Sequence, residues 1–213
     1  MISFRVLRGC AILWASTFPS SSDCARTKLY NYFGYGSNVL PSTMTALRRV
    51  KPINATAAVL PNHALRFDGP GSRGIEPSAA FVTPCKSELV HGVLYTLTAD
   101  DFASVGRTEG VPFGYRWKRC LVHPYVGNCE RAGYQATLSA PPVEAYTLVS
   151  PALGEDDVPP SSSYLGIIIE GAKKWQFDRS YLDKLEAIPT AKNLIIRSGI
   201  SRILLECAQR LST

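Results

Sequence analysis

The residues of this chain best suited to chemistry lie in a glycine-punctuated turn after an aromatic strand. Residues 32–38 read Tyr-Phe-Gly-Tyr-Gly-Ser-Asn. Gly34 and Gly36 allow a sharp turn and close approach of a ligand to the backbone amides, and Ser37 adds a hydroxyl. A short helix is predicted over 41–49, and its positive N-terminal end would face the turn. The turn is therefore suited to holding a small anion.

A single glutamate offers proton-transfer chemistry further along the chain. Glu109 stands in the sequence Thr-Glu-Gly-Val-Pro (108–112), between a predicted short helix and a predicted strand over 115–125. Side chains at the ends of such elements often point into a site. A solvated loop glutamate is the simpler interpretation of this segment taken alone, so the case for catalysis depends on the other motifs.

Three blocks of sequence occur in the order found in one known family. The first contains Tyr35-Gly36-Ser37-Asn38, the second is Glu109-Gly-Val, and the third is Pro159-Pro-Ser-Ser-Ser-Tyr164 followed by Gly171-Ala-Lys. Together they resemble the γ-glutamylcyclotransferase (AIG2-like) family, and the resemblance covers roughly residues 30–188. Three ordered blocks are far more specific than a lone glycine turn.

The resemblance implies a catalytic residue and a set of substrate-binding residues. Glu109 matches the family's general acid/base, which acts on the α-amine of a γ-glutamyl group. Tyr115 is a further candidate for the pocket wall. The resemblance matches two tyrosines downstream of Glu109, Tyr146 and Tyr164. The alternative for each is an interior tyrosine whose hydroxyl finds a partner. The predicted substrate-binding residues are Tyr35, Gly36, Ser37, Asn38, Tyr146 and Tyr164.

The implied reaction is an intramolecular cyclisation that converts the γ-glutamyl group to 5-oxoproline and releases the attached amine. The resemblance implies neither a cofactor nor a metal. The leaving group is left open: it is an amino acid, another amine or the remainder of glutathione. Asn38 disfavours the glutathione-specific branch of the family, which carries a different residue after Tyr-Gly-Ser. The alternative is a non-catalytic member of the fold that binds a small ligand or a partner protein. Retention of Glu109 favours the enzyme.

Short apolar runs bounded by Gly, Pro and Asn predict a strand-rich fold. Few helical patterns separate these runs, so most strands must pair antiparallel. The fold class is therefore α+β, and the family resemblance implies a mostly antiparallel mixed sheet curled into a small barrel with flanking helices. Helices are predicted after Thr98, with Gly106 as the stop, and over 161–175 and 178–188. The predicted strands are 29–34, 54–60, 63–68, 78–83, 90–97, 115–125, 133–138 and 143–149.

The chain is predicted to consist of one domain with two extensions. Residues 1–27 resemble a targeting presequence because the first 22 contain Arg5 and Arg8 and no acidic residue. The expected destination is a plastid or a mitochondrion; an uncleaved tail on a cytoplasmic protein is the alternative. The family domain spans 28–190, and 191–213 is predicted to be a linker and a helix with an apolar docking stripe.

Composition argues against several other classes of protein. The 213 residues carry a net charge of only +6, and 19% are charged. No basic run is interleaved with aromatic residues, so no nucleic-acid partner is expected. Stable membrane insertion is not expected either, because the apolar stretch near the N-terminus is too short to span a bilayer. The six cysteines form no CxxC pair, which argues against a zinc site and favours reduced thiols. The expected partner is a small γ-glutamyl substrate.

Overall fold

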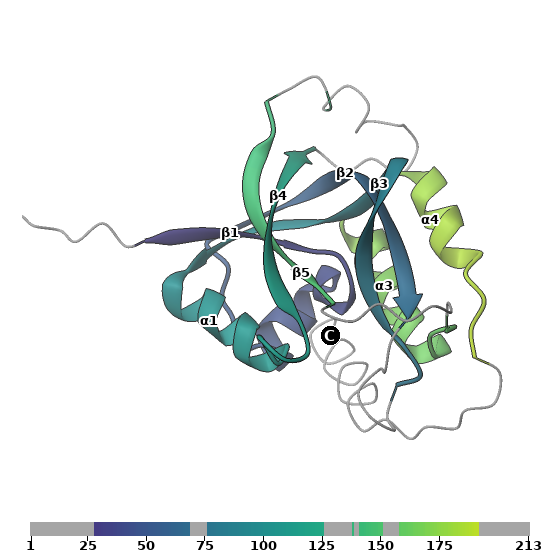
Figure 1. Ribbon diagram of the computed structural model, residues 1–213, viewed down its shortest axis with the longest axis horizontal. Coiled ribbons are helices and arrows are strands. Elements are labelled where there is room, and N and C mark those ends of the chain that lie inside the picture. The colour runs from purple at the N-terminus through teal and green to yellow at the C-terminus, as the bar shows by residue number, and fades with distance from the viewer. Residues whose placement is uncertain (1–27, 69–75, 126–137, 139–140, 151–157, 192–213) are drawn as a thin grey trace, which may run out of the picture.

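The protein is described by a computed structural model, which covers residues 28–68, 76–125, 138, 141–150 and 158–191. Five strands close into a barrel in the order β1-β3-β2-β4-β5 (Figure 1). Every pairing is antiparallel except that of β1 with β5, which is parallel. This confirms the predicted mixed, mostly antiparallel barrel. The strands are β1 (Leu29–Gly34), β2 (Asn54–Asp68), β3 (Ala79–Thr98), β4 (Arg116–Pro124) and β5 (Val143–Val149).

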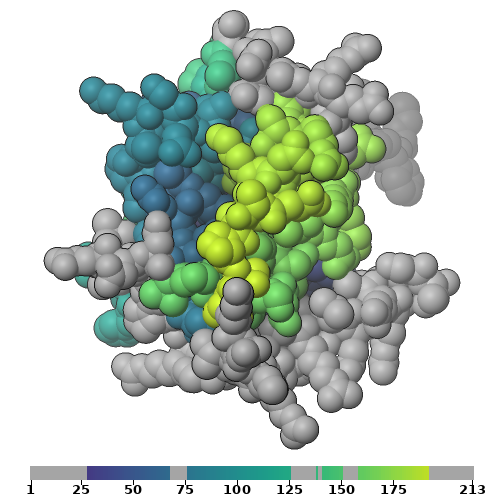
Figure 2. Space-filling view, turned by 90° about the vertical axis from the view of Figure 1, so that its right-hand side faces the viewer, coloured from purple at the N-terminus to yellow at the C-terminus, as the bar shows by residue number. Residues whose placement is uncertain are grey.

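Helices flank the barrel on two sides. In Figure 1, α1 lies below β1, whereas α3 and α4 lie beside β3. The space-filling view of Figure 2 shows α3 and α4, in green to yellow, as one continuous surface next to the blue strands. The core beneath them is built from apolar side chains of the strands and the inner helix faces. The helices are α1 (Ala99–Thr108), α3 (Ser162–Lys174) and α4 (Arg179–Glu186), with a 3₁₀ turn η1 (Ser37–Val39) and a π turn η2 (Thr43–Leu47).

The two long strands β2 and β3 correct the prediction of four shorter ones. They pair with each other over almost their whole length. The expected break in β2 is a register shift between Pro61 and His63, where Asn62 has a φ of +56°. Pro61 lacks the N–H that a ladder needs, and the bulge absorbs this defect without ending the strand. The residues that predicted a turn between two strands therefore form a bulge within one long strand of the β2–β3 hairpin.

The helix predictions held for α3 and α4 and need two corrections near the site. The helical segment after Pro41 has the wide hydrogen bonding of a π turn, with the Arg48 N–H donating to the Thr43 carbonyl. Helix α1 passes through Gly106 and continues to Thr108. The glycine that follows the helix is Gly110, whose backbone is left-handed with a φ of +71°. Helices often end at a glycine in this conformation. Glu109 is therefore the C-cap of α1.

Some predicted segments lie outside the described residues. They are the presequence 1–27, the strand 133–138 apart from residue 138, and the C-terminal helix within 192–213. Among the described residues, Cys85 and Cys120 are free thiols. No helix in this part of the chain is long and apolar enough to cross a membrane.

A histidine of β3 is buried in the core among aromatic side chains. His91 of β3 is 2% exposed, its Nδ1 lies 2.7 Å from the Tyr125 hydroxyl oxygen, and its ring stacks on Tyr181 at 4.3 Å. Burial lowers the pKa of His91 from 6.5 to about 3, and the charge of Lys184 on α4 adds to the effect. The folded state thus keeps His91 neutral at pH values where an exposed histidine takes up a proton.

Acid should destabilise this protein through His91. Because the pKa is depressed in the folded state, the unfolded chain binds the extra proton first, and stability present above pH 6.5 is lost as the pH falls toward 3. At 1.36 kcal/mol per pH unit, lowering the pH to about 4.5 should cost about 2–3 kcal/mol from this group. Urea unfolding of the wild type and His91→Phe at about pH 7 and pH 4.5 measures it. Equal pH dependence in the two proteins would contradict the assignment.

Candidate active site

A half-open recess lies where β1 ends, between the barrel and α3. It encloses about 280 Å³, open solvent at its mouth included. Even with that solvent counted, the volume is below the usual range for sites of drug-sized ligands, so the recess suits a small ligand or one end of a larger one. The lining residues are Tyr32, Tyr35, Gly36, Ser37, Asn38, Ala80, Glu109, Tyr115, Leu148 and Tyr164.

The turn after β1 forms one wall and is held from several sides. The Asn38 carbonyl accepts a hydrogen bond from the Tyr95 hydroxyl (2.7 Å), and the Val39 carbonyl accepts one from Trp175 Nε1 (2.9 Å). A Cβ at Gly36 would lie 3.2 Å from the Tyr164 hydroxyl oxygen, a tight contact that would press on this side chain of the recess. Helix α3 packs closely against the end of η1 at Gly171, where a Cβ would lie 2.7 Å from the Leu40 nitrogen. The backbone of the turn is thus fixed by the barrel and by α3.

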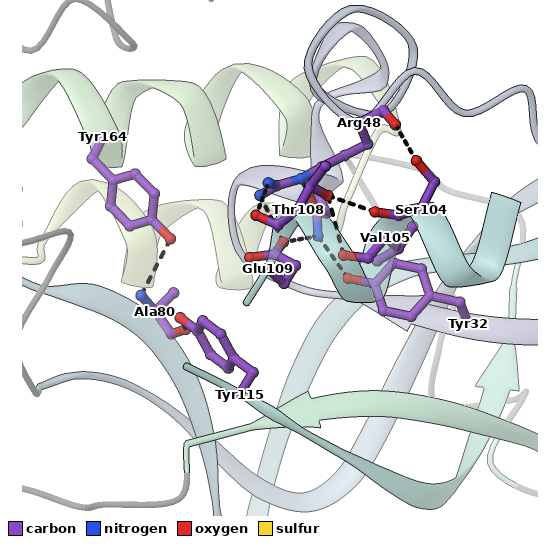
Figure 3. A network of polar contacts seen from close by, with 10 residues as sticks. Tyr32, Arg48, Ala80, Ser104, Val105, Thr108, Glu109, Tyr115 and Tyr164 are labelled. Carbon is purple, nitrogen blue, oxygen red and sulfur yellow. Dashed lines mark hydrogen bonds and ion pairs between the residues drawn. The ribbon is translucent and has the colours of Figure 1, made fainter. Parts of the chain in front are cut away.

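Glu109 faces the recess from the end of α1. Its side chain is 14% exposed, and its Oε1 lies 2.6 Å from Arg48 Nη2 and accepts a hydrogen bond of 2.7 Å from Asn38 Nδ2. Figure 3 shows Glu109 between Arg48 and Tyr32 on one side and Tyr115 and Tyr164 on the other. Among the described residues that line the recess, Glu109 is the only one with a formal charge. A substrate cation would meet its carboxylate directly.

Asn38 has almost no hydrogen-bonding capacity left for a ligand. Its Nδ2 donates to the Tyr32 hydroxyl (2.6 Å) and to Glu109 Oε1, and its Oδ1 accepts from Arg48 Nε (3.1 Å). The side chain is buried. Rotating the amide by 180° would place an oxygen against the carboxylate, so the network fixes its orientation. Asn38 joins the catalytic candidate to the barrel rather than presenting its amide to a substrate.

Four tyrosine hydroxyls around the recess can form further hydrogen bonds, two of them as donors and two as acceptors. Those of Tyr32 and Tyr164 accept hydrogen bonds, from Asn38 Nδ2 and from the Ala80 N–H (3.2 Å), so their hydrogens remain available. Those of Tyr35 and Tyr115 donate, to the carbonyls of Leu148 (2.6 Å) and Ala80 (3.2 Å), so their oxygens remain available as acceptors.

These four hydroxyls remain neutral at ordinary pH. Burial raises the pKa of Tyr32, Tyr35 and Tyr115 well above the usual value, and it raises the pKa of Tyr164 to about 12. The neighbouring Glu109 charge raises the pKa of each of them further. They can therefore orient a polar substrate without exchanging protons with it.

Comparison with known proteins identifies the family of this chain. The family described as "Gamma-glutamyl cyclotransferase, AIG2-like" matches residues 32–165, more than half of the chain. The chain belongs to this family. The matched range begins at Tyr32 and ends one residue after Tyr164, so every described residue that lines the recess belongs to the family's shared segment.

Individual relatives of the chain are distant. The γ-glutamyl cyclotransferase gliK of Claviceps purpurea is 29% identical over 158 residues, which cover 67% of this chain and 62% of the relative. The γ-glutamyl cyclotransferase aclK of Aspergillus oryzae is 26% identical over 174 residues, covering 75% and 61%. The matched part of this chain thus spans about three fifths of the length of these curated relatives.

Solved structures support the fold. One titled "Gamma-glutamyl cyclotransferase" aligns with a TM-score of 0.66 at 22% identity, covering 84% of this chain and 99% of its own. A human protein titled as uncharacterized aligns with a TM-score of 0.66 at 23% identity, covering 83% and 98%. The γ-glutamyl cyclotransferase fold is therefore shown for this chain.

The structure brings most of the predicted residues of this cyclotransferase-family site together. Tyr35, Gly36, Ser37, Asn38 and Tyr164 line the recess around Glu109, and so does Tyr115. Sequence reasoning did not assign Tyr32, Arg48, Ala80 or Leu148 to the site. Tyr32 stands within the recognised motif, which could have suggested it, whereas only the closed barrel reveals the other three.

Tyr146, predicted to bind substrate, is not among the described residues that line the recess. Its ring packs in an aromatic cluster with Phe102 of α1 at 5.3 Å and Trp117 of β4 at 6.4 Å, and Arg119 lies over it. The residue of β5 that reaches the recess is Leu148. The alternative role of a packed tyrosine describes Tyr146 better than substrate binding.

A pair of matched substitutions tests this division of the tyrosines. Tyr164→Phe removes a hydroxyl that faces the recess, and losing one hydrogen bond of about 0.5–1.5 kcal/mol should lower kcat/KM by about 2- to 10-fold. Tyr146→Phe removes a hydroxyl of the aromatic cluster and should change kcat/KM by less than about 2-fold, because no substrate contact is lost. Steady-state kinetics on both variants gives the comparison. A larger effect at Tyr146 than at Tyr164 would show the placement to be wrong.

Proposed function

We propose that this protein is a γ-glutamyl cyclotransferase that converts a γ-glutamyl group to 5-oxoproline and releases the attached amine, with Glu109 as general acid and base. The observation that carries the proposal is a single carboxylate, held by Arg48 and Asn38, in a small recess of otherwise neutral groups. A γ-glutamyl head has an ammonium for that carboxylate and a carboxylate for the turn. Family membership supports the same assignment.

The proposed reaction needs one proton acceptor and one proton donor. Glu109 takes a proton from the α-ammonium, and the free amine attacks the γ-carbonyl carbon of the same group. A carbon–nitrogen bond closes the five-membered lactam, and the bond from the γ-carbon to the leaving nitrogen breaks. Glu109 passes its proton to that nitrogen and takes up the second proton that the attacking nitrogen loses on ring closure. The lactam keeps one N–H, and transfer of the second proton to the released amine, which leaves as an ammonium, restores the carboxylate. Water is not consumed, and the atoms balance.

Positioning is expected to supply most of the rate. The nucleophile is already tethered to its target, and well-oriented intramolecular reactions reach effective molarities of about 10⁵ M or more. The turn at 35–38 would hold an anionic part of the substrate through its backbone N–H groups, either the α-carboxylate or the oxyanion that forms at the γ-carbon. The free hydrogens of Tyr32 and Tyr164 are suited to the same task.

The recess also suggests where the leaving group lies. It encloses about 280 Å³ even with open solvent counted, so it suits the γ-glutamyl head better than an entire tripeptide. The leaving group would then extend through the mouth. Few contacts at the mouth would distinguish one leaving group from another, so we propose that several γ-glutamyl compounds are accepted.

Release of 5-oxoproline from a substrate panel tests the proposed function. The panel contains γ-glutamyl amino acids, ε-(γ-glutamyl)lysine and glutathione, each incubated with the full chain, and 5-oxoproline is measured by mass spectrometry. Release from at least one compound is the expected result. Folded protein that binds these compounds and releases nothing would instead indicate a non-catalytic binding member of the fold.

A further inference from the structure

Arg48 stands behind Glu109, outside the recess, at the end of the π turn η2. Its side chain is only 10% exposed, and all three guanidinium nitrogens have partners. Nη2 pairs with Glu109 Oε1, Nε donates to Asn38 Oδ1, and Nη1 donates to the Thr108 carbonyl at 3.0 Å. The Arg48 carbonyl accepts a hydrogen bond from Ser104 on α1. One side chain thus joins the turn after β1 to the end of α1.

The two oxygens of Glu109 have different surroundings. Oε1 takes the contacts from both Arg48 Nη2 and Asn38 Nδ2. Oε2 has no hydrogen bond or ion pair with any residue that the structure describes. Because Glu109 lines the recess, Oε2 is the oxygen left for a substrate. In Figure 3 the carboxylate meets Arg48 on one side and faces Tyr115 and Tyr164 on the other.

Arg48 is also the only cation among the described groups that act on the Glu109 carboxylate. The others are neutral: the Asn38 amide and the hydroxyls of Tyr32, Tyr35, Tyr115 and Tyr164. Removing the guanidinium would leave a carboxylate largely shielded from water without a countercharge. Such a carboxylate holds its proton more tightly.

We propose that Arg48 is a positioning residue that fixes Glu109 by Oε1, so that Oε2 exchanges the proton with the substrate. The inference rests on the proposed function, to which it adds a residue outside the recess and the choice of oxygen. A guanidinium donates in a rigid planar fork and can serve Glu109, Asn38 and Thr108 at once. A lysine ammonium supplies the charge without that geometry.

Three variants separate the charge, the geometry and a general effect of the segment. Arg48→Gln removes both charge and fork, Arg48→Lys keeps the charge, and Arg49→Gln removes the same charge from the exposed neighbouring residue. Values of kcat and KM are measured from about pH 5 to pH 9 on the best substrate of the panel. Circular dichroism and thermal unfolding establish that each variant is folded.

For Arg48→Gln we expect kcat to fall about 10- to 100-fold, within the range for general acid–base catalysis. KM should change less than about 3-fold, because Arg48 does not line the recess. The acid limb of the kcat profile should move to higher pH. Arg48→Lys should leave the acid limb in place and recover only part of kcat. Arg49→Gln should match the wild type.

Several results would overturn the inference. One is a folded Arg48→Gln variant with the kcat and pH profile of the wild type; another is a rise in KM with unchanged kcat, which would mean that Arg48 binds substrate. If Arg48→Gln does not fold, Arg48→Lys decides, since a kcat equal to the wild type would exclude a need for the fork. A general loss of stability without a change in the pH profile would indicate a structural role alone.

A measurement without turnover keeps this inference separate from the proposed function. If the wild type releases no 5-oxoproline, the proposed function fails, but the Glu109 carboxyl carbon can still be followed by ¹³C NMR during a pH titration. The midpoint in Arg48→Gln, or in Arg48→Lys if the former does not fold, is compared with the wild type. Arg48→Gln should titrate at higher pH and Arg48→Lys close to the wild type. Coincident midpoints for Arg48→Gln and the wild type, or a displaced Arg48→Lys midpoint, would overturn the electrostatic role of Arg48.

Discussion

Replacing Glu109 with glutamine is expected to lower the rate of 5-oxoproline release by about 10²- to 10⁴-fold, the usual contribution of a general acid/base. Glutamine has nearly the same shape. Its oxygen can keep the contacts that Arg48 and Asn38 make with Oε1, so its nitrogen would face the recess. The variant should fold and bind ligand while lacking a proton acceptor at that position. Steady-state kinetics with the best substrate of the panel measures the loss.

A matched control separates the missing carboxyl from a change in net charge. Glu144→Gln makes the same replacement on an exposed side chain of β5, whose partner Arg119 is also exposed. This variant should keep the wild-type rate. If Glu109→Gln also retained more than about half of the rate, another group would have to move the proton.

Replacing Gly171 with alanine is expected to destabilise the fold and impair the site together. The new Cβ would lie 2.7 Å from the Leu40 nitrogen and 2.8 Å from the Val39 carbonyl carbon. Backbone atoms cannot rotate away as a side chain can, so α3 and η1 must separate. Overpacking of this kind costs about 1–3 kcal/mol. Because η1 continues directly from the turn at 35–38, a displacement approaching 1 Å could lower kcat/KM by up to about 10²-fold.

The same helix supplies the control for this substitution. A Cβ at Gly166 would meet nothing within 4 Å. Gly166→Ala should therefore stabilise the protein by about 0.5–1 kcal/mol through the better helix propensity of alanine, with activity unchanged. Urea unfolding and kinetics on both variants complete the comparison. Equal stabilities for the two alanine variants would mean that α3 and η1 are packed more loosely than described.

The chain's local patterns predicted the elements whose ends carry their own signals. Strands β1 and β5 match the predicted 29–34 and 143–149, because each is a short apolar run bounded by turn residues. Helix α3 begins after Ser161, whose side chain accepts the Tyr164 N–H as a cap does. The prediction that Gly106 ends α1 was wrong. Gly106 faces Trp117, and the glycine that ends the helix is Gly110.

The parts of the site that sequence could not supply depend on contacts between distant elements. Tyr146 and Leu148 lie two residues apart on one face of β5, and a strand pattern cannot choose between them. The choice is made by α1, which places Phe102 against Tyr146 and leaves Leu148 at the recess. Arg48 looked like the end of a short helix, and its contact with Glu109 spans 61 positions of sequence that only the folded barrel brings together.

Closure of the barrel also determines how late in folding the recess can form. The parallel pair of β1 with β5 joins Tyr32 to Tyr146, and the Tyr35 hydroxyl reaches the Leu148 carbonyl across 113 positions. Contacts so far apart in sequence carry a large loop-closure entropy and form slowly. The hairpin of β2 and β3 can form earlier from neighbouring residues. A nascent chain therefore has no recess until residues as late as Tyr164 have joined the barrel, and a fragment that stops before α3 lacks one wall of it.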